Sequence, residues 1–300
     1  MSISVSNISK LYGAQKALNN ISFEVGGNEI IGFLGPNGAG KSTMMKILTC
    51  YIPPSEGSAK VCGFDILEQS LDVRKQIGYL PEHNPLYLDM YVKEFLEFVG
   101  NIHKIKNVTG RVKEMIDITG LQLEQNKKIG ALSKGYRQRV GLAQAMIHDP
   151  KVLIMDEPTT GLDPNQLEEI RSLIKSLGKQ KTVMLSTHIM QEVEAICDRV
   201  IIINKGEIVA NDETKNLQKN TTRQIVTVEF DKEIKTDLLK TIEGVEQVKS
   251  LTETTWQLFS SAQVDIRKEI FNFAVANNLS VLTLNKEEQK IEDVFKELTK

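Results

Sequence analysis

Cysteine is scarce in this 300-residue chain, and its three cysteines, Cys50, Cys62 and Cys197, lie far apart in the sequence. No two of them have C-x-x-C spacing, so the sequence indicates neither a disulfide framework nor a zinc site, and a reducing compartment fits best. No apolar run approaches the ~20 residues of a membrane-crossing helix, and no basic segment leads into an apolar stretch at the N-terminus. We therefore expect neither a secretory signal nor a membrane span.

An excess of positive charge is absent as well, because 37 lysines and arginines stand against 39 aspartates and glutamates. A protein that grips a nucleic acid backbone over a wide face normally carries a basic excess, so broad nucleic-acid binding is disfavoured. The hydrophobic fraction of 41% and the charged fraction of 25% are typical of a folded chain, which excludes a wholly disordered protein. The length suggests two domains of ~150 residues each.

Strand-like and helix-like stretches alternate through the first part of the chain. Residues 29–34 are a short apolar run that predicts a buried strand, and residues 41–50 carry apolar side chains at helical spacing. A strand that leads into a helix through glycines is the opening of an α/β unit. Strand signals disappear over about residues 83–147, which predicts a helical subdomain. We therefore predict an α/β domain over residues 1–218.

The pattern changes after a polar stretch, residues 212–222, which we interpret as a linker. From residue 224 to residue 284 the expected order of elements is β-α-β-β-α-β, the split unit of ferredoxin-like folds. A last helix is expected over residues 289–298. The sequence therefore predicts a small α+β C-terminal domain over residues 219–300.

Residues 35–42, Gly-Pro-Asn-Gly-Ala-Gly-Lys-Ser, match the pattern G-x-x-x-x-G-K-[ST] between an expected strand and an expected helix. Inward-turned backbone N–H groups form a nest for anions, and the helix N-terminus adds its dipole. Lys41 supplies a cation to the β- and γ-phosphates of a nucleotide, and the Ser42 hydroxyl can bind Mg²⁺. A purely structural glycine turn is disfavoured because all eight positions agree. The predicted nucleotide site consists of Gly35, Pro36, Asn37, Gly38, Ala39, Gly40, Lys41, Ser42 and Thr43.

Residues 152–157 form an apolar strand that ends in two carboxylates, Asp156 and Glu157. A strand of the same parallel sheet would bring Asp156 beside the phosphate loop, where Mg²⁺ needs oxygen ligands. Glu157 could hold and polarise the attacking water as a general base. Such a strand end is by itself more often only solvated, but the phosphate loop upstream favours the functional interpretation.

Together with Leu-Ser-Lys-Gly-Tyr-Arg-Gln-Arg at residues 132–139, these motifs resemble the nucleotide-binding domain of ATP-binding cassette (ABC) transporters. The resemblance covers about residues 2–215. It implies a P-loop NTPase fold of ABC type and an ATPase that uses ATP and Mg²⁺. It also implies a homodimer that encloses two Mg-ATP and drives a separate membrane permease.

In that family the segment at residues 132–136 is the signature, which reaches across the dimer to the partner's γ-phosphate. The resemblance therefore assigns Ser133, Lys134 and Gly135 to the second chain's nucleotide, although Lys134 and Tyr136 replace the family's usual glycine and glutamine. Ser133 is also expected as the N-cap of the helix that follows, where its hydroxyl and the helix dipole both favour an anion. Capping alone would explain this serine equally well.

Two further positions at the nucleotide follow from the resemblance. Tyr12 corresponds to the aromatic residue that stacks on adenine, with an ordinary edge-strand tyrosine as the alternative. His188, after the apolar strand at residues 182–186, resembles the switch histidine that contacts the γ-phosphate. His188 thus joins Lys41 and Glu157 as a catalytic residue. The other histidines are expected to be ordinary surface residues: His83, His103 and His148.

The resemblance also identifies two loops. Asp163, in the Gly-Leu-Asp sequence after the carboxylates, corresponds to the family's dimer-contact loop. Glu82 stands where the family's lid glutamine usually falls. A glutamate can ligate Mg²⁺ or water, so Glu82 is a third candidate for the metal beside Ser42 and Asp156. The lid loop is also expected to link the site to a helix of the membrane partner.

A finer resemblance rests on residues 77–87, on the signature form at residues 132–139 and on the ending at residues 291–299. These stretches look like the ATP-binding subunit of the gliding-motility-associated ABC transporter of Bacteroidetes-type bacteria. Related multidrug and sodium efflux subunits share much of them. The resemblance implies an exporter subunit that is cytoplasmic and held on the inner face of the cell membrane through its permease.

Two alternatives belong to other classes of function. A soluble cassette ATPase could act as a switch on ribosomes or DNA without a permease, but the single cassette, the absent basic excess and the absence of a long helical arm weaken it. The C-terminal domain could instead bind a small molecule or a protein and regulate the ATPase. No residue in it identifies a ligand, because Trp256 and Phe271 are expected in its core.

Overall fold

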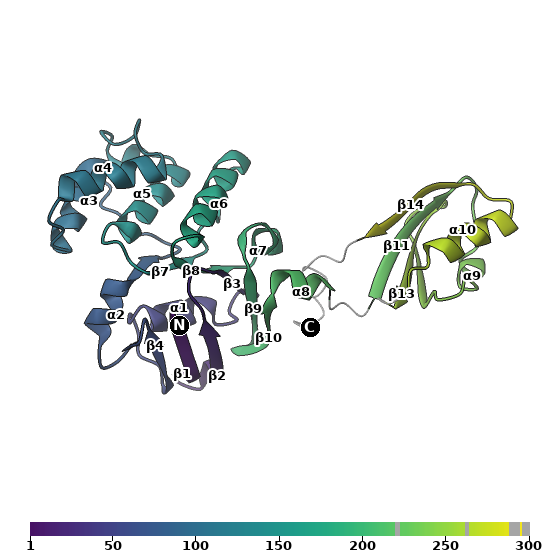
Figure 1. Ribbon diagram of the computed structural model, residues 1–300, viewed down its shortest axis with the longest axis horizontal. Helices are drawn as coiled ribbons and strands as arrows, with labels where there is room; N and C mark the ends of the chain where they lie inside the picture. The colour runs from purple at the N-terminus through teal and green to yellow at the C-terminus, as the bar shows by residue number, and fades with distance from the viewer. Residues whose placement is uncertain (220–222, 262–263, 288–294, 296–300) are drawn as a thin grey trace. The chain divides into compact units, whose positions relative to one another are not determined.

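The computed structural model describes residues 1–219, 223–261, 264–287 and Phe295 (Figure 1). The chain divides into two compact units, with the division between Thr214 and Lys215. None of the described helices is long and apolar enough to cross a membrane. The helix predicted over residues 289–298 lies outside the described residues, apart from Phe295.

An antiparallel sheet with the strand order β2-β1-β4-β5 covers one side of the first unit. Its strands are β1 (Ile3–Tyr12), β2 (Gln15–Val25), β4 (Glu56–Val61) and β5 (Phe64–Asp65). Alternate side chains of β1 and β2 point to opposite faces, and Ile3, Val5 and Ile21 are buried on the inner one. This sheet therefore contributes one wall of the core.

The second sheet has six strands in the order β10-β9-β3-β8-β7-β6. They are β3 (Ile30–Leu34), β6 (Ile77–Leu80), β7 (Val152–Asp156), β8 (Thr182–Thr187), β9 (Arg199–Asn204) and β10 (Glu207–Glu213). All neighbours are parallel except the β9–β10 hairpin at the edge. The register places Leu34 beside Thr187 and Asp156 beside Ser186. The carboxyl ends of β3, β8 and β7 therefore share one edge of the sheet.

Helix α1 (Lys41–Leu48) lies between the two sheets, because it contacts β2 and β4 of one and β7 and β8 of the other. Its apolar side chains Met44, Met45, Ile47 and Leu48 are fully buried. Burial of one such side chain stabilises the fold by roughly 1.5–3 kcal/mol. The helix that follows the phosphate loop is thus fixed at the centre of the core.

The remaining helices of the first unit follow the sheet strands or form a separate group. Helices α2 (Ser70–Gln76), α6 (Pro164–Gly178) and α7 (Met190–Ile196) belong to the α/β part. Between β6 and β7 lie α3 (Val92–Ile102), α4 (Val108–Thr119), the short 3-10 helix Ile129–Ala131 and α5 (Lys134–Met146). Figure 1 shows α3, α4 and α5 gathered together, apart from β1 and β2. No strand occurs among them, as the helical periodicity of this region predicts.

The second unit contains one four-stranded sheet in the order β12-β13-β11-β14, with every pair of neighbours antiparallel. Its described elements are β11 (Arg223–Phe230), α9 (Thr236–Leu239), β12 (Gln247–Ser250), β13 (Thr255–Ser261), α10 (Arg267–Ala276) and β14 (Val281–Glu287). Trp256 and Leu258 are buried in the core of this unit. The expectation that Phe271 is buried is wrong, because its side chain is 57% exposed. Ile270 and Ala274, one helical turn apart, take the core-facing positions of α10.

The polar stretch 212–222 is only in part the linker that its composition predicts. Asp212 and Glu213 still pair with β9 as the end of β10, and helix α8 (Thr214–Lys219) follows at once. The Thr214 hydroxyl donates to the carbonyl oxygen of Cys197 at 2.9 Å. Backbone pairing and a side-chain hydrogen bond thus override polarity, and residues 220–222 lie outside the described chain.

Candidate nucleotide site

The phosphate loop joins the buried strand β3 to α1, and two of its glycines leave no room for a side chain. Gly40, with φ +108°, would place a Cβ atom 2.5 Å from the carbonyl oxygen of Ala17. A Cβ atom on Gly35 would lie equally close to the carbonyl oxygen of Ile203. Gly40 also caps α1 without a side-chain hydrogen bond, so the first-turn N–H groups have no side-chain partner from the cap. This arrangement favours an anion at the loop.

Lys41 is the cation of this loop, and only 6% of it is exposed. Its Nζ donates to the carbonyl oxygens of Gly35 at 2.8 Å and Pro36 at 3.2 Å and lies 3.8 Å from Oε1 of Glu157. Burial lowers the pKa of Lys41, while the neighbouring carboxylates of Glu157 and Asp156 oppose this shift. The ammonium group is therefore held by acceptors that phosphate oxygens can replace.

Asp156 ends β7 as a buried carboxylate that is 3% exposed. Its Oδ1 accepts hydrogen bonds from the hydroxyls of Ser42, at 3.1 Å, and Ser186. The structure thus brings together the two residues that the sequence assigns to a metal, Ser42 and Asp156. Among the residues that the structure describes, no group of three or more His, Cys, Asp or Glu side chains could hold a metal ion.

Glu157 follows with a left-handed backbone, φ +49°, and its carboxylate is held from three sides. His188 places Nδ1 at 3.0 Å and 2.9 Å from Oε1 and Oε2, and the Thr160 hydroxyl donates to Oε2 at 3.1 Å. The Glu157 N–H group lies 3.1 Å from the hydroxyl of Ser186. Together with Lys41, these contacts fix the orientation of the Glu157 carboxylate in the cleft.

One cleft of about 740 Å³ collects most of the predicted nucleotide residues, which is within the usual size range of small-molecule sites. It is lined by Tyr12, Gln15, Ala17, Asn37, Gly38, Gly40, Lys41, Ser42, Thr43, Glu82, Glu157, Thr160 and His188. Gly35, Pro36 and Ala39 belong to the loop but do not line the cleft. Asp156 lines a neighbouring hollow of about 450 Å³, which shares Ser42 and Glu82 with the cleft.

Four lining or supporting residues of the site escape the sequence motifs: Gln15, Ala17, Thr160 and Ser186. Ser186 could have been found, since it is a polar end to an apolar strand. Thr160 could not, because its role depends on the turn that it closes, in which its N–H donates to the Glu157 carbonyl oxygen at 3.3 Å. Gln15 and Ala17 carry no such signal. Tyr12, at the end of β1, is 50% exposed on the rim of the cleft, with Lys10 Nζ 5.4 Å from its ring centroid.

The structure does not bring the signature residues to this cleft. Ser133 caps α5, with its Oγ accepting the N–H of Tyr136 at 3.3 Å, so the helix begins at Lys134. Gly135 lines a separate hollow of about 270 Å³ together with Asp163. Asp163 caps α6, where its Oδ1 accepts the N–H of Gln166 at 2.9 Å. Gly135 of the predicted signature and Asp163 of the predicted dimer loop are therefore neighbours in a hollow outside the cleft that holds Lys41.

The expectation for the remaining histidines is wrong for His148. Its ring is half-buried, stacks on that of His103 at 4.2 Å between centroids, and places Nε2 3.0 Å from the carbonyl oxygen of Ile77. Burial, with the neighbouring His103, lowers the pKa of His148 to about 4. His103 and His83 are exposed, as expected.

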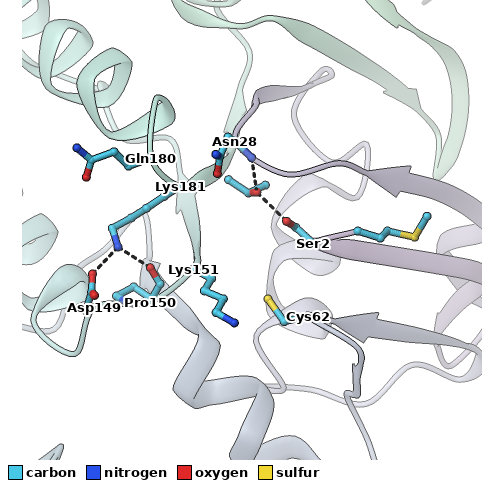
Figure 2. A pocket seen from close by; sticks show the side chains of 10 residues that line it. Ser2, Asn28, Cys62, Asp149, Pro150, Lys151, Gln180 and Lys181 are labelled. Carbon is cyan, nitrogen blue, oxygen red and sulfur yellow. Dashed lines mark hydrogen bonds and ion pairs between the residues drawn. The ribbon is translucent and has the colours of Figure 1, made fainter.

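A further hollow of about 550 Å³ lies at the opposite edge of the six-stranded sheet, where β7 and β8 begin (Figure 2). Figure 2 shows the Lys181 ammonium directed at Asp149 and Pro150, at 2.6 Å and 2.7 Å. The hydroxyl of Ser2 lies 2.8 Å from that of Thr182. This hollow lies at the amino ends of β7 and β8, whereas the phosphate loop lies at the carboxyl end of β3, so the two are separate.

Comparison with known proteins agrees with this geometry. The sequence model of the ABC transporter family matches residues 18–160. The bacitracin transport ATP-binding protein BcrA of Bacillus licheniformis is 31% identical over 302 residues, which cover 99% of this chain and 96% of the relative. The Nod factor export ATP-binding protein I of Burkholderia lata is 36% identical over 210 residues, which are 68% of each chain.

A solved dimer of an ATP-binding cassette, in a post-hydrolysis state bound to ADP and Pi, has the same fold as the first unit. It superposes with a TM-score of 0.65 and 27% identity and covers 70% of this chain and 98% of that one. The chain therefore belongs to the ABC transporter ATP-binding proteins, with their P-loop NTPase fold, and is an ATPase of that family.

Proposed function

We propose that two copies of this chain enclose two Mg-ATP head to tail, each site combining one chain's cleft with the partner's signature. The observation that carries the proposal is that the predicted site residues lie in two separate places on the chain. Lys41, Asp156 and Glu157 meet at one edge of the sheet, whereas Ser133 and Gly135 lie outside that cleft. A second chain supplies what the cleft lacks, and the similar cassette solved as a dimer supports this arrangement.

Magnesium fits the residues at this edge. Mg²⁺ is usually held by one or two carboxylates together with phosphate oxygens and waters. The Ser42 hydroxyl and the Asp156 carboxylate, whose oxygens are 3.1 Å apart, supply hard oxygen donors of this kind. Bound Mg²⁺ would neutralise charge that develops on the phosphates. Glu82 lines the same hollow and is a further candidate for the metal or its water.

Glu157 is the general base of the proposed reaction. In the structure its carboxylate lies near Lys41 and contacts His188. A triphosphate in the cleft offers Lys41 stronger acceptors than two backbone carbonyls and frees the Glu157 carboxylate for water. Glu157 then accepts the proton of the attacking water, while His188 and Lys41 stabilise the charge on the γ-phosphate.

The work of the dimer is done on a membrane permease, and we propose that the transport runs outward. The names of the bacitracin transport and Nod factor export relatives support a role in transport, and the second name supports the outward direction. Attachment at the inner face of the membrane, through the lid loop at Glu82, follows from the same proposal. The gliding-motility subgroup rests only on the sequence resemblance of residues 77–87, 132–139 and 291–299, and within the last of these stretches the structure describes Phe295 alone. The ribosome or DNA switch has no support among these relatives.

We also propose the domain assignment as residues 1–218 for the cassette and 219–300 for a ferredoxin-like accessory domain. The division between Thr214 and Lys215 supports the first boundary. The antiparallel strand order β12-β13-β11-β14, with a helix before β12 and another before β14, supports the ferredoxin-like fold. Regulation of the ATPase is the role we assign to this domain.

The experiment that tests the dimer uses Glu157→Gln, which keeps the shape of the side chain and removes its basicity. We expect this variant to bind Mg-ATP, to lose hydrolysis by at least about a hundredfold, and to elute as a dimer on size-exclusion chromatography. The same protein with ADP should elute as a monomer. A monomer at every ATP concentration would contradict the proposal.

A further inference from the structure

A side chain of the signature helix reaches the loop that carries the general base. The Nε2 group of Gln138, on α5, donates to the carbonyl oxygen of Pro158 at 2.9 Å. Pro158 is buried and directly follows Glu157. Among the described residues no other donor reaches this carbonyl, and a buried carbonyl without a donor is costly. The bond therefore holds the backbone beside Glu157 to α5.

A second contact joins the other end of this loop to the same helix. Gly161 has a left-handed φ of +74°, and a Cβ atom on it would lie 2.3 Å from Nζ of Lys134. Lys134 is the first residue of α5. Helix α5 thus lies close to the loop 158–161 at both ends, through the Gln138 hydrogen bond at one end and the tip of the exposed Lys134 side chain at the other.

The loop carries two marks of a conformation that is not fully relaxed. Glu157 is a non-glycine residue with φ +49°, a region that costs free energy for residues with a side chain. Thr159 is 2% exposed, and its hydroxyl has no hydrogen-bond partner within the described part of the chain. Both costs reduce the free-energy gap to another arrangement, which is the property of an element that two sites can bias.

We propose that Gln138 is a positioning residue that couples the two nucleotide sites of the dimer. When Ser133 engages the partner's nucleotide, α5 is fixed, Gln138 holds the Pro158 carbonyl, and Glu157 is aligned for the nucleotide in its own cleft. Hydrolysis in one site thereby waits for occupation of the other. The inference rests on the proposed dimer, because only there does Ser133 meet a nucleotide.

A double-mutant cycle tests the coupling. Gln138→Met keeps the length of the side chain and removes the donor, and we expect kcat to fall about fivefold with little change in KM for ATP. Ser133→Ala removes the hydroxyl that, in the proposal, contacts the partner's nucleotide and fixes α5. The double variant should then be no slower than Ser133→Ala alone, because Gln138 has nothing left to transmit. Multiplying effects, or an unchanged kcat in Gln138→Met, overturn the proposal.

Gln125→Met is the matched control. Gln125 is also half-buried in the helical subdomain, and its Nε2 donates to the carbonyl oxygen of Gln122 at 2.8 Å, but it does not contact the loop after Glu157. A merely structural loss should lower the melting temperature of both glutamine variants alike. Only Gln138→Met should change kcat and show non-additivity with Ser133→Ala. An equal effect of Gln125→Met on kcat overturns the coupling.

Size-exclusion chromatography separates failure of the coupling from failure of the dimer. Glu157→Gln and the double variant Glu157→Gln, Gln138→Met should both form dimers with ATP. If neither forms a dimer, the proposed function fails and the coupling falls with it. If only the double variant stays monomeric, Gln138 acts on dimer closure rather than on alignment of the base, which overturns the inference alone.

Discussion

The two units of the chain differ in what they bury. The first unit buries charged side chains as well as an apolar core: Lys41, Glu124, Asp156, Glu157 and Glu192 are each at most 9% exposed. In the described part of the second unit, the buried polar residues are Gln224 and Ser260, and neither carries a charge. A buried charge costs several kcal/mol unless other groups satisfy it. The buried charges at the cleft therefore lower the stability of the first unit, whereas the described core of the second unit buries no charge.

This difference indicates where a change of residue alters chemistry and where it alters only folding. At the cleft, the buried ammonium group of Lys41 has partners that a ligand can replace, the Gly35 and Pro36 carbonyl oxygens. In the second unit, Val226, Val228 and Leu258 pack into one cluster. Changes at the cleft should thus affect turnover, and changes in the cluster should affect stability.

Lys41→Ala should give the largest effect and is the strongest test of the first half of the comparison. Removal of the ammonium group takes away the cation that the β- and γ-phosphates need, so kcat/KM for ATP should fall about a thousandfold. Initial rates of phosphate release at increasing ATP concentration measure it. Urea unfolding followed by circular dichroism, which includes the helices and strands of the first unit, should keep its midpoint and so show that the variant is folded.

Lys75→Ala is the control, since Lys75 is an exposed lysine that pairs with Asp72 on the surface of α2. Its activity should stay within twofold of the original chain. If Lys41→Ala retained hydrolysis within tenfold, the cleft would not be the site of chemistry.

The sequence predicts the parts of the site whose spacing is local. Gly40 and Lys41 are recognisable because the loop geometry fixes which residue types fit at each position, as the 2.5 Å approach of the Ala17 carbonyl to Gly40 illustrates. Thr160 could not be assigned in the same way, because its role depends on the conformation that Glu157 adopts. The role of Gln138 could not be predicted either, because it depends on a contact with Pro158, which lies 20 residues further along the chain.

The same distinction applies to the fold. Strand β3 and helix α1 follow from strong apolar periodicity, whereas β4 has two buried side chains, Ala59 and Val61, and gave no signal of its own. Phe271 illustrates the opposite error, because an aromatic residue on an amphipathic helix suggests burial, but its position one residue after Ile270 turns it to solvent. Hydrophobicity predicts the presence of an element better than its orientation.

Leu258→Ala should give the next largest effect and tests the second half of the comparison. Leu258 is fully buried in the core of the second unit, and removing its side chain leaves a cavity that should cost about 3 kcal/mol. Urea unfolding followed by Trp256 fluorescence reports this unit directly, because Trp256 belongs to the same core. ATPase activity should remain within twofold.

Phe271→Ala is the paired control, with an expected change below about 0.5 kcal/mol because the side chain is mostly exposed. A loss of ATPase activity in Leu258→Ala, under conditions where the first unit remains folded, would break the comparison. It would mean that the second unit sets the basal rate.

The smallest expected effect concerns a buried titratable group of the first unit that lies outside the cleft. Burial lowers the pKa of His148 from 6.5 to about 4, with His103 and Arg111 acting in the same direction and the Ile77 carbonyl oxygen and Asp149 against it. The unfolded chain therefore binds more protons between pH 6.5 and pH 4, so the free energy of unfolding falls as the pH falls through this window. Since the ring is partly exposed, we expect a loss of about 1 kcal/mol.

His148→Gln should flatten this pH dependence, because glutamine can still donate to the Ile77 carbonyl oxygen and does not titrate. Urea unfolding at pH 7.5 and pH 5, followed by circular dichroism, measures it, and His83→Gln, whose side chain is 91% exposed, should change nothing. Trp256 fluorescence should report a smaller acid loss, since the described core of the second unit buries no charged group. An equal acid loss in both signals, unaffected by His148→Gln, would show that the burial of polar groups does not distinguish the two units.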